Sequence, residues 1–330
     1  MECGGAPPLW TYRGWKKSSG CSGNLCKSGS RCDCTHDILS NAFDPRNPRL
    51  ICVALKFEIV PAPELSLAEQ AEVFASAFTG YVGGSFQMNA TTLASFLTAQ
   101  GIDLCYSRFA RNDQGELVSF GYINRTGNIS RLAGMGTVGT ARRSGAAAFV
   151  LSSLLEEAKA RGDQAMVLEV IEQNPAAVKL YESHGFRSLG RLLGWRHKPG
   201  EAPIQNGDLR ELSVLEASRW PTTPDYPDLP WQVSRHAATK VASARAFALD
   251  DVAVVTGDPG TIPTRLHSFL GLNEDTGESM RELLRQLLAR FPEAEFYAPP
   301  IFPERFGQEI FQPLGFDQEK LSQFLMRKDL

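Results

Sequence analysis

Two arginines precede a run of small residues at Arg142-Arg143-Ser144-Gly145-Ala146-Ala147, between a segment of strand character and one with helical periodicity. The first four N–H groups of a helix have no intrahelical partner, and the helix dipole adds partial positive charge there. Gly145 lets the backbone approach a ligand closely, and the arginines supply cations. This combination suits a pyrophosphate. The alternative is a tight turn with two surface arginines.

A second run of interest extends from Asn174 to Phe186 and reads NPAAVKLYESHGF. Asn174 can cap a short helix that has proline at its first position, and Gly185 can end that helix. Tyr181 lies on this helix, and a phenol can donate a proton to a departing group. Its alternative role is that of a half-buried aromatic side chain.

Together these runs resemble the Q/R-x-x-G-x-G/A and N-x-x-A-x-x-L-Y-x-x-x-G-F motifs of the GNAT superfamily of N-acetyltransferases. The motif-level resemblance covers residues 134–186, and the order of elements extends it to about 55–196. It implies an α/β fold with a mixed sheet, splayed open beside its fourth strand. It also implies acetyl-CoA as cosubstrate and direct acetyl transfer to a primary amine. Gly139 stands where the family often has proline, and Ala147 replaces the commoner second glycine.

The resemblance also assigns roles to individual residues. The backbone of the fourth strand would pair with the pantetheine arm, and the loop would cradle the pyrophosphate. The residues concerned are Met135, Thr137 and Val138 on the strand, and Arg142, Arg143, Ser144, Gly145, Ala146 and Ala147 in the loop. Asn174 would hydrogen-bond the cofactor arm in addition to capping its helix. Tyr181 would face the thioester sulfur and protonate the leaving thiolate.

A general base is harder to identify from the sequence. Glu169 interrupts the otherwise apolar run AMVLEVI, where a carboxylate is costly unless it is paired or functional. We therefore take Glu169 as the first candidate and Glu172 as the next. The alternative is that Glu169 points into the splay or pairs with an arginine and moves no proton.

The hydrophobic pattern predicts the elements that position these residues. We expect strands at 53–60, 103–111, 116–124, 128–138 and 165–171, and helices at 66–78, 90–100 and from the loop to about 160. Ser66 and Glu69 form a capping-box pattern at the start of the first helix.

The order of elements after residue 241 repeats the back half of the first set. This order suggests a repeated domain. Its expected elements are a hairpin at 244–256, a strand at 264–272, a helix at 278–291 and strands at 294–298 and 321–328. At the offset of 133 between the two long helices, Gly145 corresponds to Glu278. In the alignment of Tyr181–Phe186 with Phe311–Phe316, Tyr181 corresponds to Phe311. The acidic loop 273–278 would repel a pyrophosphate. We therefore expect a degenerate GNAT-like domain that packs on the first and helps to shape the acceptor pocket.

Three regions follow: an extension at 1–50, a catalytic domain at 51–198 and the degenerate domain at 199–330. Six of the seven cysteines lie within the first 52 residues, in a stretch rich in Gly and Ser. A zinc site there is conceivable, but the spacing favours a flexible extension, and we expect no metal. The formal net charge of -3 and the absence of long apolar runs predict a cytoplasmic protein that binds neither nucleic acid nor membrane.

The sequence does not name the acceptor, which we expect to be a small-molecule or peptide amine, and homodimer formation stays open. The alternative function is a non-catalytic acyl-CoA-binding sensor. Such a sensor would have no use for the hydroxyl of Tyr181.

Overall fold

The computed structural model describes residues 56–84, 87–200, 209–222, 229–241, 243–261, 263–272 and 277–330. The extension at 1–50, with the predictions of a flexible arm or a zinc site, lies outside the described residues. So do Glu274 and Asp275 of the acidic loop. Within the described ranges, no helix is both long and apolar enough to cross a membrane.

The first half of the described chain follows the predicted order of elements. Its strands are β1 (Phe57–Pro61), β2 (Asp103–Asn112), β3 (Leu117–Thr126), β4 (Ile129–Thr137), β5 (Ala165–Ile171) and β6 (Arg187–His197). Its helices are α1 (Leu67–Ala77), α2 (Ala90–Ala99), α3 (Ala146–Ala160) and α4 (Pro175–Ser183). The capping box of α1 is present, because Ser66 Oγ accepts from the Glu69 amide and the Glu69 carboxylate accepts from the Ser66 amide.

The second half contains β7 (Arg210–Leu212), β8 (Arg245–Leu249), β9 (Val252–Thr256), β10 (Thr264–Gly271), β11 (Phe296–Pro303) and β12 (Asp317–Asp329). Its helices are α5 (Val214–Ala217), α6 (Arg235–Ala238), α7 (Gly277–Arg290) and α8 (Glu304–Phe306). A π-helical turn at Gly307–Phe311 and a 3-10 turn at Gln312–Leu314 continue α8. The sequence pattern missed β7, α5 and α6, which are too short to show a period.

Helices α1 and α3 pack on opposite faces of the first-half sheet. Neighbouring residues of β3 show this, since their side chains point to opposite faces. Phe120 stacks on Phe74 of α1, with ring centroids 5.4 Å apart. A Cβ at Gly121 would lie 2.5 Å from Leu154 of α3, so glycine permits this close helix packing.

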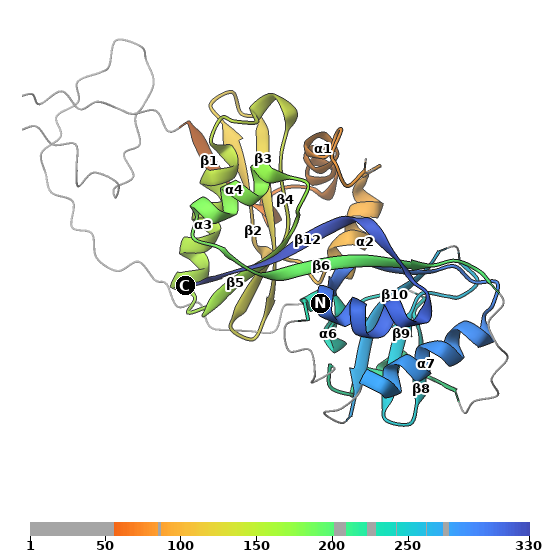
Figure 1. The fold of residues 1–330 in the computed structure, drawn as a ribbon. Coiled ribbons are helices and arrows are strands. Elements are labelled where there is room, and N and C mark those ends of the chain that lie inside the picture. Colours follow the sequence, from red (N-terminus) through yellow and green to blue (C-terminus); the bar gives the residue numbers. More distant parts are fainter. Residues whose placement is uncertain are drawn as a thin grey trace, which may run out of the picture. The chain divides into compact units, whose positions relative to one another are not determined.

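Strands β6 and β12 join the two halves into one sheet (Figure 1). The strand order is β1-β2-β3-β4-β5-β12-β6-β11-β10-β9-β8-β7. The last strand of the second half therefore lies between β5 and β6, while β6 lies between β12 and β11. Each half thus completes its part of the sheet with a strand from the other. The domain boundary at 198/199 stays a proposal. Across this boundary, β6 of the first half pairs with β11 and β12 of the second half, and β12 pairs with β5.

The second half also repeats the strand register of the first. Strands β4 and β5 pair in parallel with Arg131 opposite Val167, and β10 and β11 do so with Arg265 opposite Tyr297. The antiparallel pairing of β4 with β3 skips one residue, Ala133. The pairing of β10 with β9 skips His267, which likewise lies two residues after the arginine. The repeat therefore extends to a β-bulge at the same position.

Candidate active site

The sheet opens between β4 and β5. Their pairing ends at Leu132 and Leu168, although β4 continues to Thr137 alongside β3 and β5 continues to Ile171 alongside β12. Within the part of the chain that the structure describes, the backbone edge of β4 beyond Leu132 therefore has no strand partner on the β5 side. This is the splay that the family resemblance predicts.

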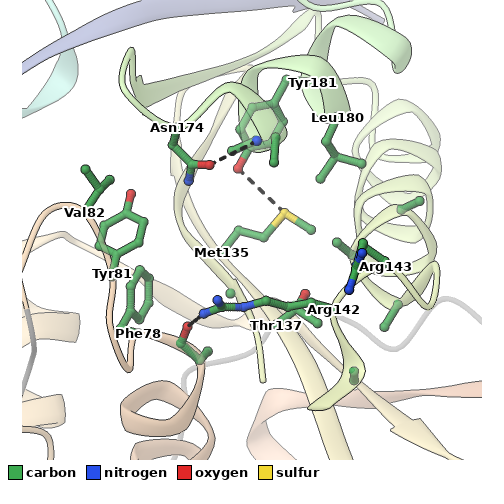
Figure 2. Close-up of a pocket in the computed structure, with 18 of the residues that line it drawn as sticks. Phe78, Tyr81, Val82, Met135, Thr137, Arg142, Arg143, Asn174, Leu180 and Tyr181 are labelled. Carbon is green, nitrogen blue, oxygen red and sulfur yellow. Dashed lines mark hydrogen bonds between the residues drawn. The ribbon is translucent and has the colours of Figure 1, made fainter. Parts of the chain in front are cut away.

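A cavity of about 670 Å³ lies at this opening (Figure 2). It brings together most of the predicted cofactor-binding residues, namely Met135, Thr137, Arg142, Arg143, Gly145, Ala146, Ala147 and Asn174, with Tyr181. Val138 and Ser144 are not among its lining residues. The Val138 amide instead donates to the Val118 carbonyl of the neighbouring strand at 2.9 Å.

The loop before α3 has a backbone suited to an anion. Gly145 is the N-cap residue at φ 96°, and a Cβ there would meet nothing within 4 Å, so the cap faces open space. Arg143 has φ 62°, a conformation that non-glycine residues seldom adopt and that often marks functional sites. Among the described residues, the amides of Ala147 and Ala148 have no hydrogen-bond acceptor, because the helical ladder begins at Phe149. These donors are free for a ligand.

Two further contacts hold this loop. Arg142 donates from Nη2 to the Ala77 carbonyl at 3.0 Å, which ties the loop to the end of α1 (Figure 2). Lys56 donates to the Ser144 carbonyl at 2.8 Å. The loop is therefore fixed before any ligand arrives.

The other end of the cavity carries Tyr181. The ring is buried, and its hydroxyl donates to the sulfur of Met135 at 3.8 Å (Figure 2). Burial, and secondarily the neighbouring Tyr81, raises the pKa of Tyr181 above the usual tyrosine range. The hydroxyl consequently stays protonated at neutral pH and remains a proton donor beside a sulfur atom.

Asn174 caps α4 as predicted, since its side chain accepts from the Ala177 amide at 3.3 Å. It also hydrogen-bonds Tyr81, a cavity residue that sequence reasoning missed. Burial raises the pKa of Tyr81, and the bond to Asn174 offsets part of that rise. Tyr81 follows α1 in a loop without a motif, so the sequence offered no signal for it.

Glu169 does not line the cavity. It pairs with Arg131 at 2.8 Å, and the two side chains are only 4% and 3% exposed. Gln232 of the second half also donates to Glu169, and Gln100 accepts from Arg131. The structure therefore favours the alternative in which Glu169 pairs with an arginine. The pair flanks Leu132 and Leu168, the last paired residues before the splay.

Glu172 is likewise engaged. Its carboxylate accepts from Ser322 of β12 at 2.6 Å and pairs with Arg191 at 3.0 Å. The hydrogen bond from Ser322, reinforced by Arg191, lowers the pKa of Glu172. Among the described residues, no Asp, Glu or His lines the cavity.

The equivalent opening in the second half is filled by aromatic rings. By strand register, Phe269 takes the place of Met135, and by the sequence alignment of the two Gly-Phe segments, Phe311 takes that of Tyr181. These rings are 5.9 Å apart and fully buried, and Phe302 and Phe306 pack against both of them. Glu278, at the position of Gly145, pairs with Arg281. Among the described residues of the second half, the packed rings therefore leave no room for a pantetheine arm at this position, and Phe311 has no proton to donate.

Comparisons with known proteins agree with this geometry. Residues 83–186 match the model of the Acetyltransferase (GNAT) family. A proposed acetyltransferase from Pyrococcus horikoshii superposes with a TM-score of 0.57 at 16% identity, covering 83% of this chain and 90% of that one. A GCN5-related N-acetyltransferase from Sphaerobacter thermophilus gives 0.55 at 13%, covering 83% and 96%.

A tandem GNAT protein from the clavulanic acid biosynthesis pathway gives a TM-score of 0.53 at 14% identity, covering 83% of this chain and 98% of that one. No curated protein matches the sequence. At these identities the structural likenesses show the fold, which is a mixed α/β GNAT fold. The family match and the splayed cavity together show that the chain contains a domain of the GNAT acetyltransferase family at residues 83–186.

Proposed function

We propose that the protein transfers an acetyl group from acetyl-CoA to a primary amine. One observation carries the proposal: a single cavity joins the free amides at the start of α3 to the protonated hydroxyl of Tyr181. The unpaired edge of β4 runs between them. A donor with a pyrophosphate at one end and a thioester at the other matches this order of groups.

The reaction would proceed by direct attack. The lone pair of the neutral amine forms a bond to the acetyl carbon, and the bond from carbon to sulfur breaks. Tyr181 gives its proton to the departing thiolate. The amine nitrogen loses a proton to water. Water then returns a proton to the phenolate of Tyr181. The products are the acetylated amine and free CoA. Because a lysine-like amine has a pKa near 10.4, we expect turnover to rise with pH as more amine becomes neutral.

The alternative is an acyl-CoA sensor without turnover. The position of the Tyr181 hydroxyl beside a sulfur atom favours the enzyme, because a proton donor at this place has a use in thiolate departure. The acceptor, which we propose to be a small-molecule or peptide amine, would enter beside Tyr81 and Val82 at the open end of the cavity. We also propose a cytoplasmic location and no nucleic-acid or membrane partner, from composition alone.

The test mixes the protein with acetyl-CoA and a panel of primary amines and follows release of thiol, with calorimetry of CoA binding in parallel. Thiol release that depends on both substrates supports the enzyme. Binding of CoA without release from any amine supports the sensor. Absence of CoA binding refutes both.

A further inference from the structure

Helix α4 forms part of the wall of the cavity, so the placement of this helix decides where the Tyr181 hydroxyl lies. Asn174 at its start and Tyr181 near its end both line the cavity, and so does Gln173, which precedes the helix. All three residues belong to the first half. Both ends of the helix, however, are contacted by strand β12 of the second half.

Ser322 joins β12 to the turn between β5 and α4. Its hydroxyl donates to the Glu172 carboxylate at 2.6 Å and accepts from Nε2 of Gln173 at 3.0 Å. Its carbonyl accepts from the Glu172 amide at 3.0 Å, and its amide donates to Oε1 of Gln173 at 3.4 Å. Ser322 is only 3% exposed. One buried residue of the second half is therefore hydrogen-bonded, through both its side chain and its backbone, to the two residues that directly precede Asn174.

The opposite end of α4 is also held by β12. Nζ of Lys328 donates to the carbonyl of His184, which is the C-cap residue of the helix. A cation at this place is favourable, because the C-terminal end of a helix carries partial negative charge. Strand β12 is itself fixed between β5 and β6 in the sheet. A single strand of the second half thus contacts both ends of the helix that carries Tyr181.

The side-chain bond of Ser322 is of a strong kind. A hydroxyl that donates to an ionised carboxylate makes a charge-assisted hydrogen bond, and the burial of Ser322 keeps competing water away. Arg191 pairs with the same carboxylate at 3.0 Å, so the turn before α4 is held from two sides. Precise placement matters here, because a shift of about 1 Å in a reacting group can lower a rate about 10²-fold.

We propose that Ser322 is a positioning residue, which fixes the turn before α4 from the second half and thereby directs the hydroxyl of Tyr181. The second half thus contributes to the site of the first, although its own equivalent opening is filled by aromatic rings. The kinetic part of this inference rests on the proposed acetyl transfer, whereas the placement of α4 does not.

Ser322→Ala removes the hydroxyl and leaves the backbone bonds. We expect turnover in the thiol-release assay to fall about tenfold or more. The Kd for CoA should change less than about threefold, because the free amides at the start of α3 are untouched. The amides of Ala177 and Val178, which donate to the Asn174 carbonyl, should exchange with solvent deuterium about tenfold faster, whereas that of Phe149 in α3 should not.

Ser268→Ala is the matched control. Ser268 is a fully buried serine of the second half, and its hydroxyl donates to the Ser234 carbonyl at 3.1 Å. We expect wild-type turnover and wild-type exchange in α4 from this variant. A double-mutant cycle with Tyr181→Phe separates the positioning of the phenol from general loosening. If Ser322 acts through Tyr181, Ser322→Ala lowers turnover less than about twofold in that background.

The proposal is overturned if Ser322→Ala keeps either the wild-type turnover of an active protein or the wild-type exchange in α4. It is also overturned if Ser268→Ala reproduces the effects, or if the loss of turnover is undiminished in the Tyr181→Phe background. Should the wild type release no thiol with any amine, acetyl transfer fails by itself. Hydrogen exchange in α4 then decides whether Ser322 places the helix.

Discussion

The hydroxyl of Tyr181 points at the sulfur of Met135 from 3.8 Å, whereas the corresponding positions in the second half hold the packed rings of Phe311 and Phe269. The same backbone pattern thus encloses a cavity in one half and a filled core in the other. The Tyr181 hydroxyl thus already donates to a thioether sulfur, and the sulfur of a departing thiolate would need a donor of the same kind. The relationship leads directly to the first prediction.

Replacing Tyr181 by Phe removes this donor and little volume. We expect turnover to fall by about 10²-fold or more while the Kd for CoA stays within about twofold. Thiol-release kinetics and calorimetry measure the two quantities. Because burial raises the pKa of Tyr181, the wild-type enzyme shows no loss of rate from tyrosine ionisation below about pH 10. Equal turnover in Tyr181→Phe would remove the proton-donor role.

Gly145 can be tested against a glycine of matched backbone. Gly145→Ala places a Cβ at φ 96° in the open cap, with strain of about 1–2 kcal/mol, and disturbs the free amides at the start of α3. We expect the Kd for acetyl-CoA to rise at least tenfold. Gly162→Ala, at φ 81° beyond the other end of α3, carries similar strain and leaves the Kd unchanged. Equal effects of both variants would mean that only stability had changed.

Glu169→Gln distinguishes a structural ion pair from a general base. Removing one partner leaves the charge of Arg131 buried, so the free energy of unfolding falls by about 3–5 kcal/mol. The pH dependence of kcat/KM keeps its wild-type shape, because the carboxylate does not line the cavity. Denaturant unfolding and a pH–rate profile provide both measurements. Loss of the limb of the profile at low pH would restore Glu169 as the base.

His267 predicts how stability responds to acid. Burial, and secondarily the charge of Arg265, lowers its pKa to about 3. The unfolded chain takes up this proton near pH 6.5, and the folded protein does not. The contribution of neutral His267 to the free energy of unfolding is therefore fully present above pH 6.5, and it decreases as the pH falls toward 3. Urea unfolding of His267→Gln should lose less stability than wild type between pH 7 and 5, by at most about 2 kcal/mol.

Because β12 of the second half lies between β5 and β6 of the first, we expect that neither half folds stably without the other. Residues 1–204 alone would lack β12 and leave the edges of β5 and β6 unpaired, which favours aggregation. We expect this fragment to be insoluble or unable to bind CoA. Co-expression with 205–330 should yield a soluble complex of the two that binds CoA. A fragment of 1–204 that binds CoA alone would show that β12 is dispensable.

Most elements could be predicted from the sequence because they are long enough to show a hydrophobic period and because their capping residues lie next to them in the chain. Ser66 and Asn174 mark the starts of α1 and α4, because each caps its helix with a local side-chain hydrogen bond that needs no tertiary contact. The loop at Arg142 and the tyrosine of α4 were found for the same reason, since their motifs are contiguous.

What the sequence could not show depends on distant partners. Glu169 looked functional because a carboxylate in an apolar strand needs an explanation, and the explanation, Arg131, lies 38 residues away. The exchange of β6 and β12 leaves no mark on either strand's own pattern. Tyr81 acquires its surroundings only when the loop after α1 meets the start of α4.

The position of β12 also orders events during synthesis. Domains generally form from the N-terminal end as the chain emerges. Here the strand that fills the gap between β5 and β6 is translated only after the whole of β7 to β11. Until then, the edges of β5 and β6 in the half that carries Tyr181 lack their β12 partner, so the sheet around the cavity is completed only late in translation.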